Sequence, residues 1–302
     1  MFEKNGLIVL NKPTGMSSSL AVQIVKRTLR PNKIGHLGTL DPLGTGVLVL
    51  AINKATKLFD EYLKKDKVYK AIFKFGIETD TLDSEGKIIN QNDKVIELSD
   101  IENVINEFVG DFDQLPPMYS AKKVNGKKAY ELARSGVEVQ MKPHDIKIHS
   151  IDIKDIRAED GGIYLSFDVF CSKGTYIRTI CDDLGKLTGF GAHAVSLRRI
   201  KCGPFSIDDA ITEEEIKEKV AEDDFDFMLP AYRALSQMTS VNVNQKEFKA
   251  IKQGKKIPAL AGTEEGVKYA AYFEGSLVAV IYKAVEGGRE LMRIERMLAS
   301  DD

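Results

Sequence analysis

The feature that most constrains the fold of this chain is a glycine-rich loop at residues 35–46, which leads directly into an apolar run at residues 47–52. Its four glycines allow backbone conformations with positive φ and close approach of another group. Pro42 favours an extended conformation at Asp41 and removes a neighbouring backbone donor. The sequence therefore predicts an active-site loop that holds Asp41 in one position before a buried strand. A structural turn in which Asp41 caps its own backbone is the alternative.

The loop matches neither of the common nucleotide-binding motifs. A P-loop ends in Gly-Lys-Ser or Gly-Lys-Thr, and this segment has neither ending. A dinucleotide fingerprint follows a strand and opens a helix, whereas Gly44-Thr45-Gly46 precedes the strand. The loop therefore offers the carboxylate of Asp41 and the imidazole of His36 rather than a phosphate cradle.

The spacing of apolar residues predicts most of the remaining elements. Strands are expected at residues 6–10, 68–76 and 163–171, and helices at about 18–29, 54–63 and 100–108. The acidic stretch at residues 208–226 is expected to be helical from Thr212 and to end a domain near Pro230. The tail predicts a helix around Phe248 and Ile251, then three strands near residues 269, 277–281 and 291–294.

Four other short motifs accompany the glycine-rich loop. They are Asn11-Lys12-Pro13-Thr14-Gly15-Met16-Ser17-Ser18, Lys67-Val68-Tyr69, Ser172-Lys173-Gly174-Thr175-Tyr176-Ile177-Arg178-Thr179 and Leu197-Arg198-Arg199. Together with Gly35-His36 and the run from Leu40 to Gly46, and in this order across roughly residues 5–200, they resemble the motifs of the TruB family of tRNA pseudouridine synthases.

The resemblance implies an α+β protein with the pseudouridine synthase fold. Its catalytic domain, residues 1–232, would contain a large mixed, mainly antiparallel sheet with a central active-site cleft. Proline and lysine residues at about 115–142 would form an RNA-contacting insertion in that domain. Residues 233–302 would form a small β-rich module that resembles a PUA domain.

The implied reaction is the isomerisation of uridine to pseudouridine at uridine 55, in the T-loop of tRNA. Asp41 would be the catalytic carboxylate, acting either by attack on the ribose or by removal of a ribose proton. Because an arginine at a helix start is unfavourable unless an anion faces it, Arg178 is expected to pair with Asp41, as the family implies. Its helix has an apolar stripe on another side, made of Ile177, Ile180, Cys181, Leu184 and Leu187.

Five further residues match substrate-contacting or supporting positions of the family. His36 would fill the space of the flipped-out nucleotide or brace it, while Tyr69, Tyr176 and Leu197 would enclose its base. From the residues alone, a core position is favoured for Tyr69 and is the alternative for Tyr176 and Leu197. Lys12 would support the active site or contact a phosphate, and its alternative is a solvated turn lysine.

Composition limits the partners and cofactors. The net charge is −2, but residues 208–226 contain ten acidic residues against two lysines, whereas residues 119–142 contain six basic residues against two acidic ones. A polyanion would therefore dock locally, and the expected partner is the tRNA T-arm, bound by a monomer without guide RNA. The three cysteines and four histidines lack metal-ligand spacing, and no cofactor is expected. No signal peptide or membrane-length apolar run is found, which favours the cytoplasm.

Two other functions remain open from the sequence. An RNA-binding protein that had lost catalysis would bind tRNA without forming product, although Asp41 and Arg178 argue against it. A glycosidase-type hydrolase would release free uracil and normally needs a second carboxylate, which the sequence does not place beside Asp41.

Overall fold

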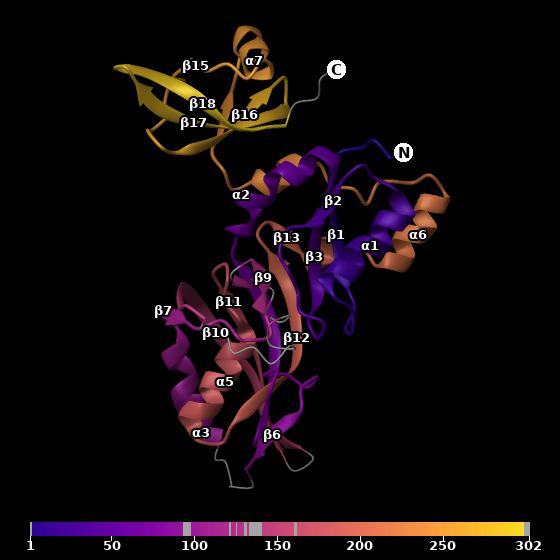
Figure 1. Ribbon diagram of the computed structural model, residues 1–302, viewed down its shortest axis with the longest axis vertical. Helices are drawn as coiled ribbons and strands as arrows, with labels where there is room; N and C mark the ends of the chain where they lie inside the picture. Colours follow the sequence, from indigo (N-terminus) through magenta and orange to yellow (C-terminus); the bar gives the residue numbers. More distant parts are fainter. Residues whose placement is uncertain are drawn as a thin grey trace.

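The computed structural model describes residues 2–92, 98–120, 122–124, 126–129, 132, 141–159 and 162–298. Figure 1 shows two parts along the long axis of the molecule, a large sheet with its helices and a smaller β-rich unit formed by the end of the chain. The helices described are α1 (Ser18–Leu29), α2 (Phe59–Leu63), α3 (Leu98–Ile105), α5 (Ile177–Thr188), α6 (Glu213–Ala221) and α7 (Gln245–Lys252). Short 3₁₀ helices are η1 (Asn53–Leu58), η2 (Asn106–Phe108), η3 (Ile207–Asp209) and η4 (Ala231–Leu235).

A nine-stranded sheet forms the large part. Its strands are β1 (Gly6–Lys12), β2 (Ile34–His36), β3 (Thr45–Ile52), β4 (Lys67–Phe75), β7 (Gly110–Gln114), β10 (His144–Glu159), β11 (Gly162–Cys171), β12 (Ala192–Cys202) and β13 (Phe205–Ser206). The order is β1-β3-β12-β4-β11-β10-β7, with β2 beside β3 and β13 beside β12. The described pairs are antiparallel except β3 with β12, which is parallel and short. The predicted mixed, mainly antiparallel sheet is confirmed.

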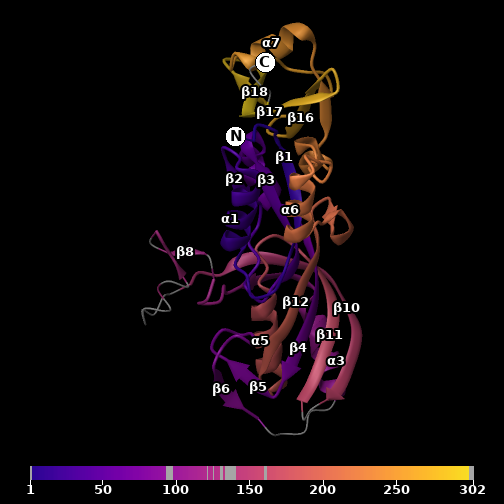
Figure 2. The same ribbon diagram turned by 90° about the vertical axis from the view of Figure 1, so that its right-hand side faces the viewer.

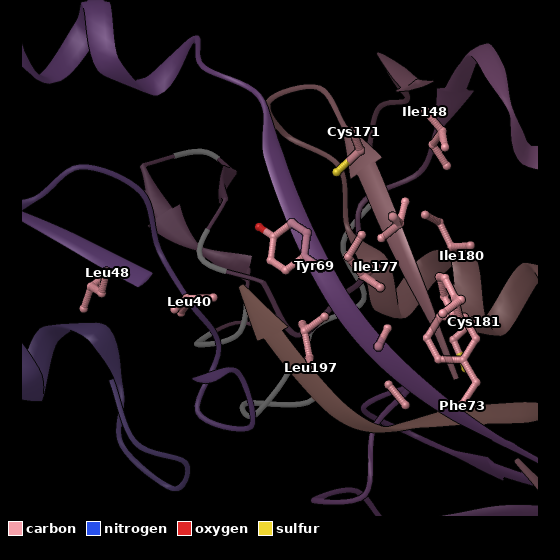
Figure 3. Close-up of a cluster of buried hydrophobic side chains, with 14 of the residues drawn as sticks. Leu40, Leu48, Tyr69, Phe73, Ile148, Cys171, Ile177, Ile180, Cys181 and Leu197 are labelled. Carbon is pink, nitrogen blue, oxygen red and sulfur yellow. The ribbon is translucent and has the colours of Figure 1, made fainter. Parts of the chain in front are cut away.

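The main core packs this sheet against buried side chains of α1, α3, α5 and α6. Alternate side chains of β4, from Tyr69 to Phe75, are buried, as the period-2 pattern predicts. Figure 2 shows α5 beside β4 and β12, and Figure 3 shows Ile177 and Ile180 of that helix directed toward the buried side chains of the sheet. Tyr69 lies at the edge of this cluster, with its hydroxyl directed away from Ile177 (Figure 3).

Two local expectations are wrong in detail. The helix expected at residues 54–63 is a 3₁₀ turn, η1, followed by the five-residue α2, because Asn53 adopts φ 54° and the Thr56 hydroxyl donates to its carbonyl. Leu187 was expected to pack inward, but it is 61% exposed. At 100° per residue, Leu187 lies about 70° around the helix axis from the centre of the apolar stripe of α5. Its side chain therefore points away from the core.

The C-terminal unit is a five-stranded sheet with α7 packed on it, so the β-rich tail is confirmed. Its strands are β14 (Ser240–Asn242), β15 (Ile257–Pro258), β16 (Lys268–Phe273), β17 (Ser276–Glu286) and β18 (Arg289–Met297). The unit contacts α2 through ion pairs of Lys268 with the buried Glu61 and of Arg296 with Asp60. A shared apolar cluster, which includes Val9 and Val280, also joins the two parts.

Two short hairpins extend from the large part. One pairs β5 (Ile77–Thr79) with β6 (Ile88–Gln91), and the other pairs β8 (Lys123–Val124) with β9 (Lys127–Lys128). Figure 2 shows β8 projecting from the body of the molecule. The second hairpin belongs to the predicted insertion, much of which, including Arg134, lies outside the described residues.

Candidate active site

The glycine-rich loop joins β2 to β3. Hydrogen bonds to Ser18 of α1 and within the loop itself fix its shape. The hydroxyl of Ser18 donates to the carbonyl of Leu40 and accepts from its N–H, both at 2.8 Å. A tight turn follows, in which the N–H of Gly44 donates to the carbonyl of Asp41 at 3.0 Å. The side chain of Asp41 remains 26% exposed. The expectation that the loop holds Asp41 in one position agrees with these contacts.

Arg178 forms the predicted ion pair with Asp41. Its Nε and Nη2 atoms lie 2.9 and 2.8 Å from the same carboxylate oxygen, Oδ2. The remaining N–H groups donate to the carbonyls of Thr81 and Tyr119 and to a second carboxylate, that of Asp83, at 3.1 Å. Because four of its N–H groups donate hydrogen bonds and Arg178 is 4% exposed, the arginine fixes the orientation of the Asp41 carboxylate.

Asp83 was not predicted as a site residue. Its second oxygen accepts from the Thr81 hydroxyl at 2.6 Å and from the N–H of Glu85 at 3.1 Å, and its side chain is 5% exposed. The number of donors on a buried arginine could have indicated a second acceptor such as Asp83, since one carboxylate cannot accept from five N–H groups. Asp80, in the same turn, is exposed and accepts from the N–H of Lys87.

A cleft of about 350 Å³ opens beside Asp41. Its lining comes from the glycine-rich loop, α2, β4, β12, the insertion and the turn before α5. The residues are Gly38, Thr39, Leu40, Asp41, Leu63, Lys67, Tyr69, Lys122, Gly174, Thr175, Tyr176, Ile177, Leu197 and Arg199. The structure thus brings together four of the predicted site residues, Asp41, Tyr69, Tyr176 and Leu197, at one cleft.

The two tyrosines of the cleft are neutral phenols at ordinary pH. Burial raises the pKa of Tyr69 to about 12, although the nearby Arg199 guanidinium opposes the shift. Burial likewise raises the pKa of Tyr176. The buried side chain of Gln114, another residue that was not predicted, holds Tyr176 by accepting from its N–H at 2.8 Å and donating to its carbonyl at 3.0 Å.

Two predicted residues lie away from the cleft lining. His36 ends β2, where it pairs with Leu50, and is not among the lining residues. Lys12 is fully buried, and its Nζ donates to the carbonyls of Pro13, Met16 and Pro42 at 2.8, 2.5 and 3.3 Å. These contacts favour a supporting role for Lys12 over a phosphate contact, because the amine ties the first turn of the chain to the glycine-rich loop.

Lys12 is expected to make stability depend on pH. Burial lowers its pKa from 10.5 to about 8, partly offset by the charge of Asp41. Between these two values the unfolded chain binds more protons than the folded one, so this residue makes the free energy of unfolding rise with pH. Urea unfolding at both ends of the window, for the wild type and Lys12→Met, measures the effect. The stability difference, wild type minus variant, should increase toward high pH, and a constant difference would contradict the assignment.

Other site types are not found in the described part of the chain. No cluster of three or more histidine, cysteine, aspartate or glutamate side chains there could hold a metal ion. The three cysteines are buried and free. No helix among the described residues is long and apolar enough to cross a membrane.

Two family models and several curated relatives match this chain. The model of the TruB family pseudouridylate synthase N-terminal domain matches residues 26–177, and that of the tRNA pseudouridylate synthase B C-terminal domain matches residues 178–236. The tRNA pseudouridine synthase B of Syntrophotalea carbinolica is 39% identical over 95% of this chain and 94% of its own. That of Clostridium perfringens strain SM101 is 42% identical over 84% of each chain. The chain belongs to the TruB family.

As a member of the TruB family it is a pseudouridine synthase, an isomerase. Solved structures support the fold: the chain titled "Crystal Structure of a Cbf5-Nop10-Gar1 Complex" aligns with a TM-score of 0.74 at 24% identity, over 97% of this chain and 85% of that one. A second, from the archaeal box H/ACA sRNP Nop10-Cbf5 complex, aligns with a TM-score of 0.73 at 23% identity, over 98% of this chain and 87% of that one. The expected pseudouridine synthase fold is confirmed.

Proposed function

We propose that this TruB family member converts uridine to pseudouridine in tRNA, in the T-loop at position 55. The observation that supports this best is the carboxylate of Asp41, oriented by Arg178 at a cleft with two tyrosines and a leucine on its walls. The names of the curated relatives support tRNA as the substrate. The substrate is bound through its T-arm by a monomer that needs no guide RNA.

The reaction leaves the composition of the nucleotide unchanged. The bond between ribose C1′ and uracil N1 breaks, the detached base turns, and C5 bonds to C1′; C5 then loses its proton, and N1 gains one. Asp41 assists the first step in one of two ways. It attacks C1′, and the Asp41–C1′ bond breaks when C5 bonds to C1′, or it removes the C2′ proton, which returns to C2′ when C5 bonds to C1′. Both routes need a carboxylate held in a fixed orientation, which the ion pair with Arg178 supplies.

The cleft suits a base that has left its stack. A uridine inside a folded loop must flip outward to reach the half-buried carboxylate of Asp41. Tyr69 then stacks on the base, Tyr176 and Leu197 enclose it, and His36 braces the flipped nucleotide from β2. Lys122, which lines the cleft from the insertion, contacts the RNA backbone.

The two sheets support a division of the chain into two domains. Residues 1–232 form the catalytic domain, with the RNA-contacting insertion at about 115–142. Residues 233–302 form a PUA-like module, whose five-stranded sheet begins at β14. The division falls within η4, where the chain passes from one part to the other.

A hydrolase is the less favoured function, although the structure corrects one premise. A second carboxylate, Asp83, does lie on the other side of Arg178 from Asp41. It accepts from Arg178, Thr81 and a backbone N–H and is not among the cleft-lining residues, so it is poorly placed to protonate a leaving base.

Substitutions of Tyr69 test the stacking role. Tyr69→Ala should lower the single-turnover rate by about 10- to 100-fold, because base stacking on an aromatic ring contributes about 1–3 kcal/mol. Tyr69→Phe should lose less, since the ring remains and only the hydroxyl contact with Arg199 at 3.5 Å is removed. The measurement is product formation with saturating tRNA. Equal, wild-type rates in both variants would contradict the role.

The activity itself is tested by tritium release from tRNA labelled at uridine C5, followed by mapping of the modified position. Release approaching one equivalent per tRNA, mapped to position 55, supports the proposal. Release mapped elsewhere would overturn the site, free uracil would favour hydrolysis, and tight tRNA binding without release would favour a binding protein.

A further inference from the structure

Arg199 is a buried cation that the chemistry above does not use. It lies on β12, is 1% exposed, and lines the cleft beside Asp41. Among the described residues no carboxylate forms an ion pair with it. Its donors instead face backbone carbonyls: Nε donates to Val47 at 2.8 Å, Nη1 to Thr39 at 3.1 Å and Nη2 to Gly38 at 3.0 Å.

These carbonyls lie at both ends of the glycine-rich loop. Gly38 and Thr39 precede Asp41 by three and two residues, and Val47 is a buried residue near the start of β3, which follows the loop. The backbone of Arg199 also meets the loop, because it pairs with Gly46 in the short parallel contact of β12 with β3. Gly46 has φ 89°, and a Cβ there would lie 2.4 Å from the Arg199 carbonyl. One residue therefore closes the loop through its side chain and its backbone.

The same residue contacts the strand that provides the stacking tyrosine. Arg199 and Tyr69 are directly opposite each other in the β12–β4 ladder. The guanidinium Nη1 lies 3.5 Å from the Tyr69 hydroxyl, and the guanidinium carbon is 6.0 Å from the ring centre. Arg199 is thus a common neighbour of the Asp41 loop and of Tyr69, which are far apart in the sequence.

Stability alone does not account for an arginine at this position. Burial of a charge without a carboxylate partner is unfavourable, because the desolvation of the ion is not offset by an ion pair. Only the planar guanidinium fork, however, can donate in fixed directions to three carbonyls and a hydroxyl at once. The arrangement is suited to holding the Asp41 loop and Tyr69 in fixed positions relative to each other.

We propose that Arg199 is a positioning residue of the isomerisation, which fixes the loop bearing Asp41 relative to Tyr69. The inference rests on the proposed function. A displacement of about 1 Å of a reacting group can cost on the order of 100-fold in rate. We call the contacts of Arg199 with the Asp41 loop and Tyr69 the clamp. Loss of the clamp should slow the chemical step and leave the affinity for tRNA nearly unchanged.

Arg199→Met removes every side-chain N–H donor but keeps a long side chain. Arg199→Lys keeps the positive charge but loses the planar guanidinium group. With saturating tRNA, the single-turnover rate should fall about 100-fold in Arg199→Met and less in Arg199→Lys, while the Kd for tRNA changes less than about twofold. Arg198→Met is the matched control, because Arg198 is the adjacent arginine of the same strand but is exposed. Its rate should stay within about twofold of wild type.

Chemical rescue separates positioning from general damage to the fold. Because Arg199 lines the cleft, guanidinium ion can enter the space left by Arg199→Ala. Millimolar guanidinium chloride should restore at least part of the lost rate, whereas sodium chloride at equal concentration should not. Failure of guanidinium to restore activity in a folded Arg199→Ala variant would contradict the clamp.

Hydrogen exchange gives a readout that does not need activity. Amides at residues 37–47 should exchange faster in Arg199→Met than in the wild type, while those of the C-terminal sheet should not change. If the wild type forms no pseudouridine, the proposed function is wrong. Amide hydrogen exchange of residues 37–47 then tests by itself whether Arg199 holds the loop. Unchanged exchange of the loop, a single-turnover rate within about threefold of wild type, or a loss explained entirely by weaker tRNA binding would each overturn it.

Discussion

Asp41→Asn should abolish pseudouridine formation, with a loss of at least about 1,000-fold in the single-turnover rate. The amide can neither attack the ribose nor remove its proton, so the loss is expected whichever route the reaction takes. The change is nearly isosteric, and Arg178 keeps Asp83 and two backbone carbonyls as acceptors. The fold should therefore survive, and the free energy of unfolding should fall far less than the activity.

The measurement is tritium release from C5-labelled tRNA under single-turnover conditions, with tRNA affinity determined in parallel. Asp80→Asn is a suitable control, because Asp80 is an exposed carboxylate that accepts only within its own turn in the described contacts. A residual rate in Asp41→Asn within tenfold of wild type would mean that Asp41 is not the catalytic carboxylate.

Arg178→Met should have the largest effect on stability. The substitution leaves Asp83, which is 5% exposed, without its cation and removes the orienting partner of Asp41. Breaking a buried pair by removal of one member typically costs about 3–5 kcal/mol. Urea unfolding should show a loss of this size, and activity should fall with it because the carboxylate is no longer held.

Arg157 provides a matched control for this variant. It also pairs with two carboxylates, those of Asp155 and Glu159, each at 2.8 Å, but it is 44% exposed. Because exposed pairs contribute only about 0–1 kcal/mol, Arg157→Met should barely change the unfolding midpoint. Equal losses in the two variants would show that burial of the Arg178 network has no special energetic role.

The sequence predicted those parts of the site that depend on local pattern or on family motifs. Glycine and proline spacing located the Asp41 loop, and the alternation of β4 placed Tyr69 on the buried face. The pairing of Arg178 with Asp41 followed from the unfavourable place of an arginine at a helix start together with the resemblance. The large mixed sheet was likewise expected and found.

The parts that were missed depend on contacts between distant segments. Asp83 belongs to a polar turn whose sequence indicates capping, and only the folded chain brings it to Arg178. Gln114 holds Tyr176 from the end of an edge strand, which no local pattern indicates. Lys12 has the appearance of a solvated turn lysine, because the carbonyls that enclose it include one from thirty residues further along the chain.

The place of β12 in the sheet has a consequence for synthesis of the protein on the ribosome. β1, β2 and β3 form one subsheet, β4, β11, β10 and β7 form another, and β12 lies between them, although it follows all of them in the sequence. A nascent chain can build both halves, yet one edge of β4 stays unpaired until residue 202 emerges. At 5–20 residues per second, that interval is roughly 6–25 s. The translation rate of residues 76–202 therefore sets how long the strand bearing Tyr69 is open to pairing with other nascent chains.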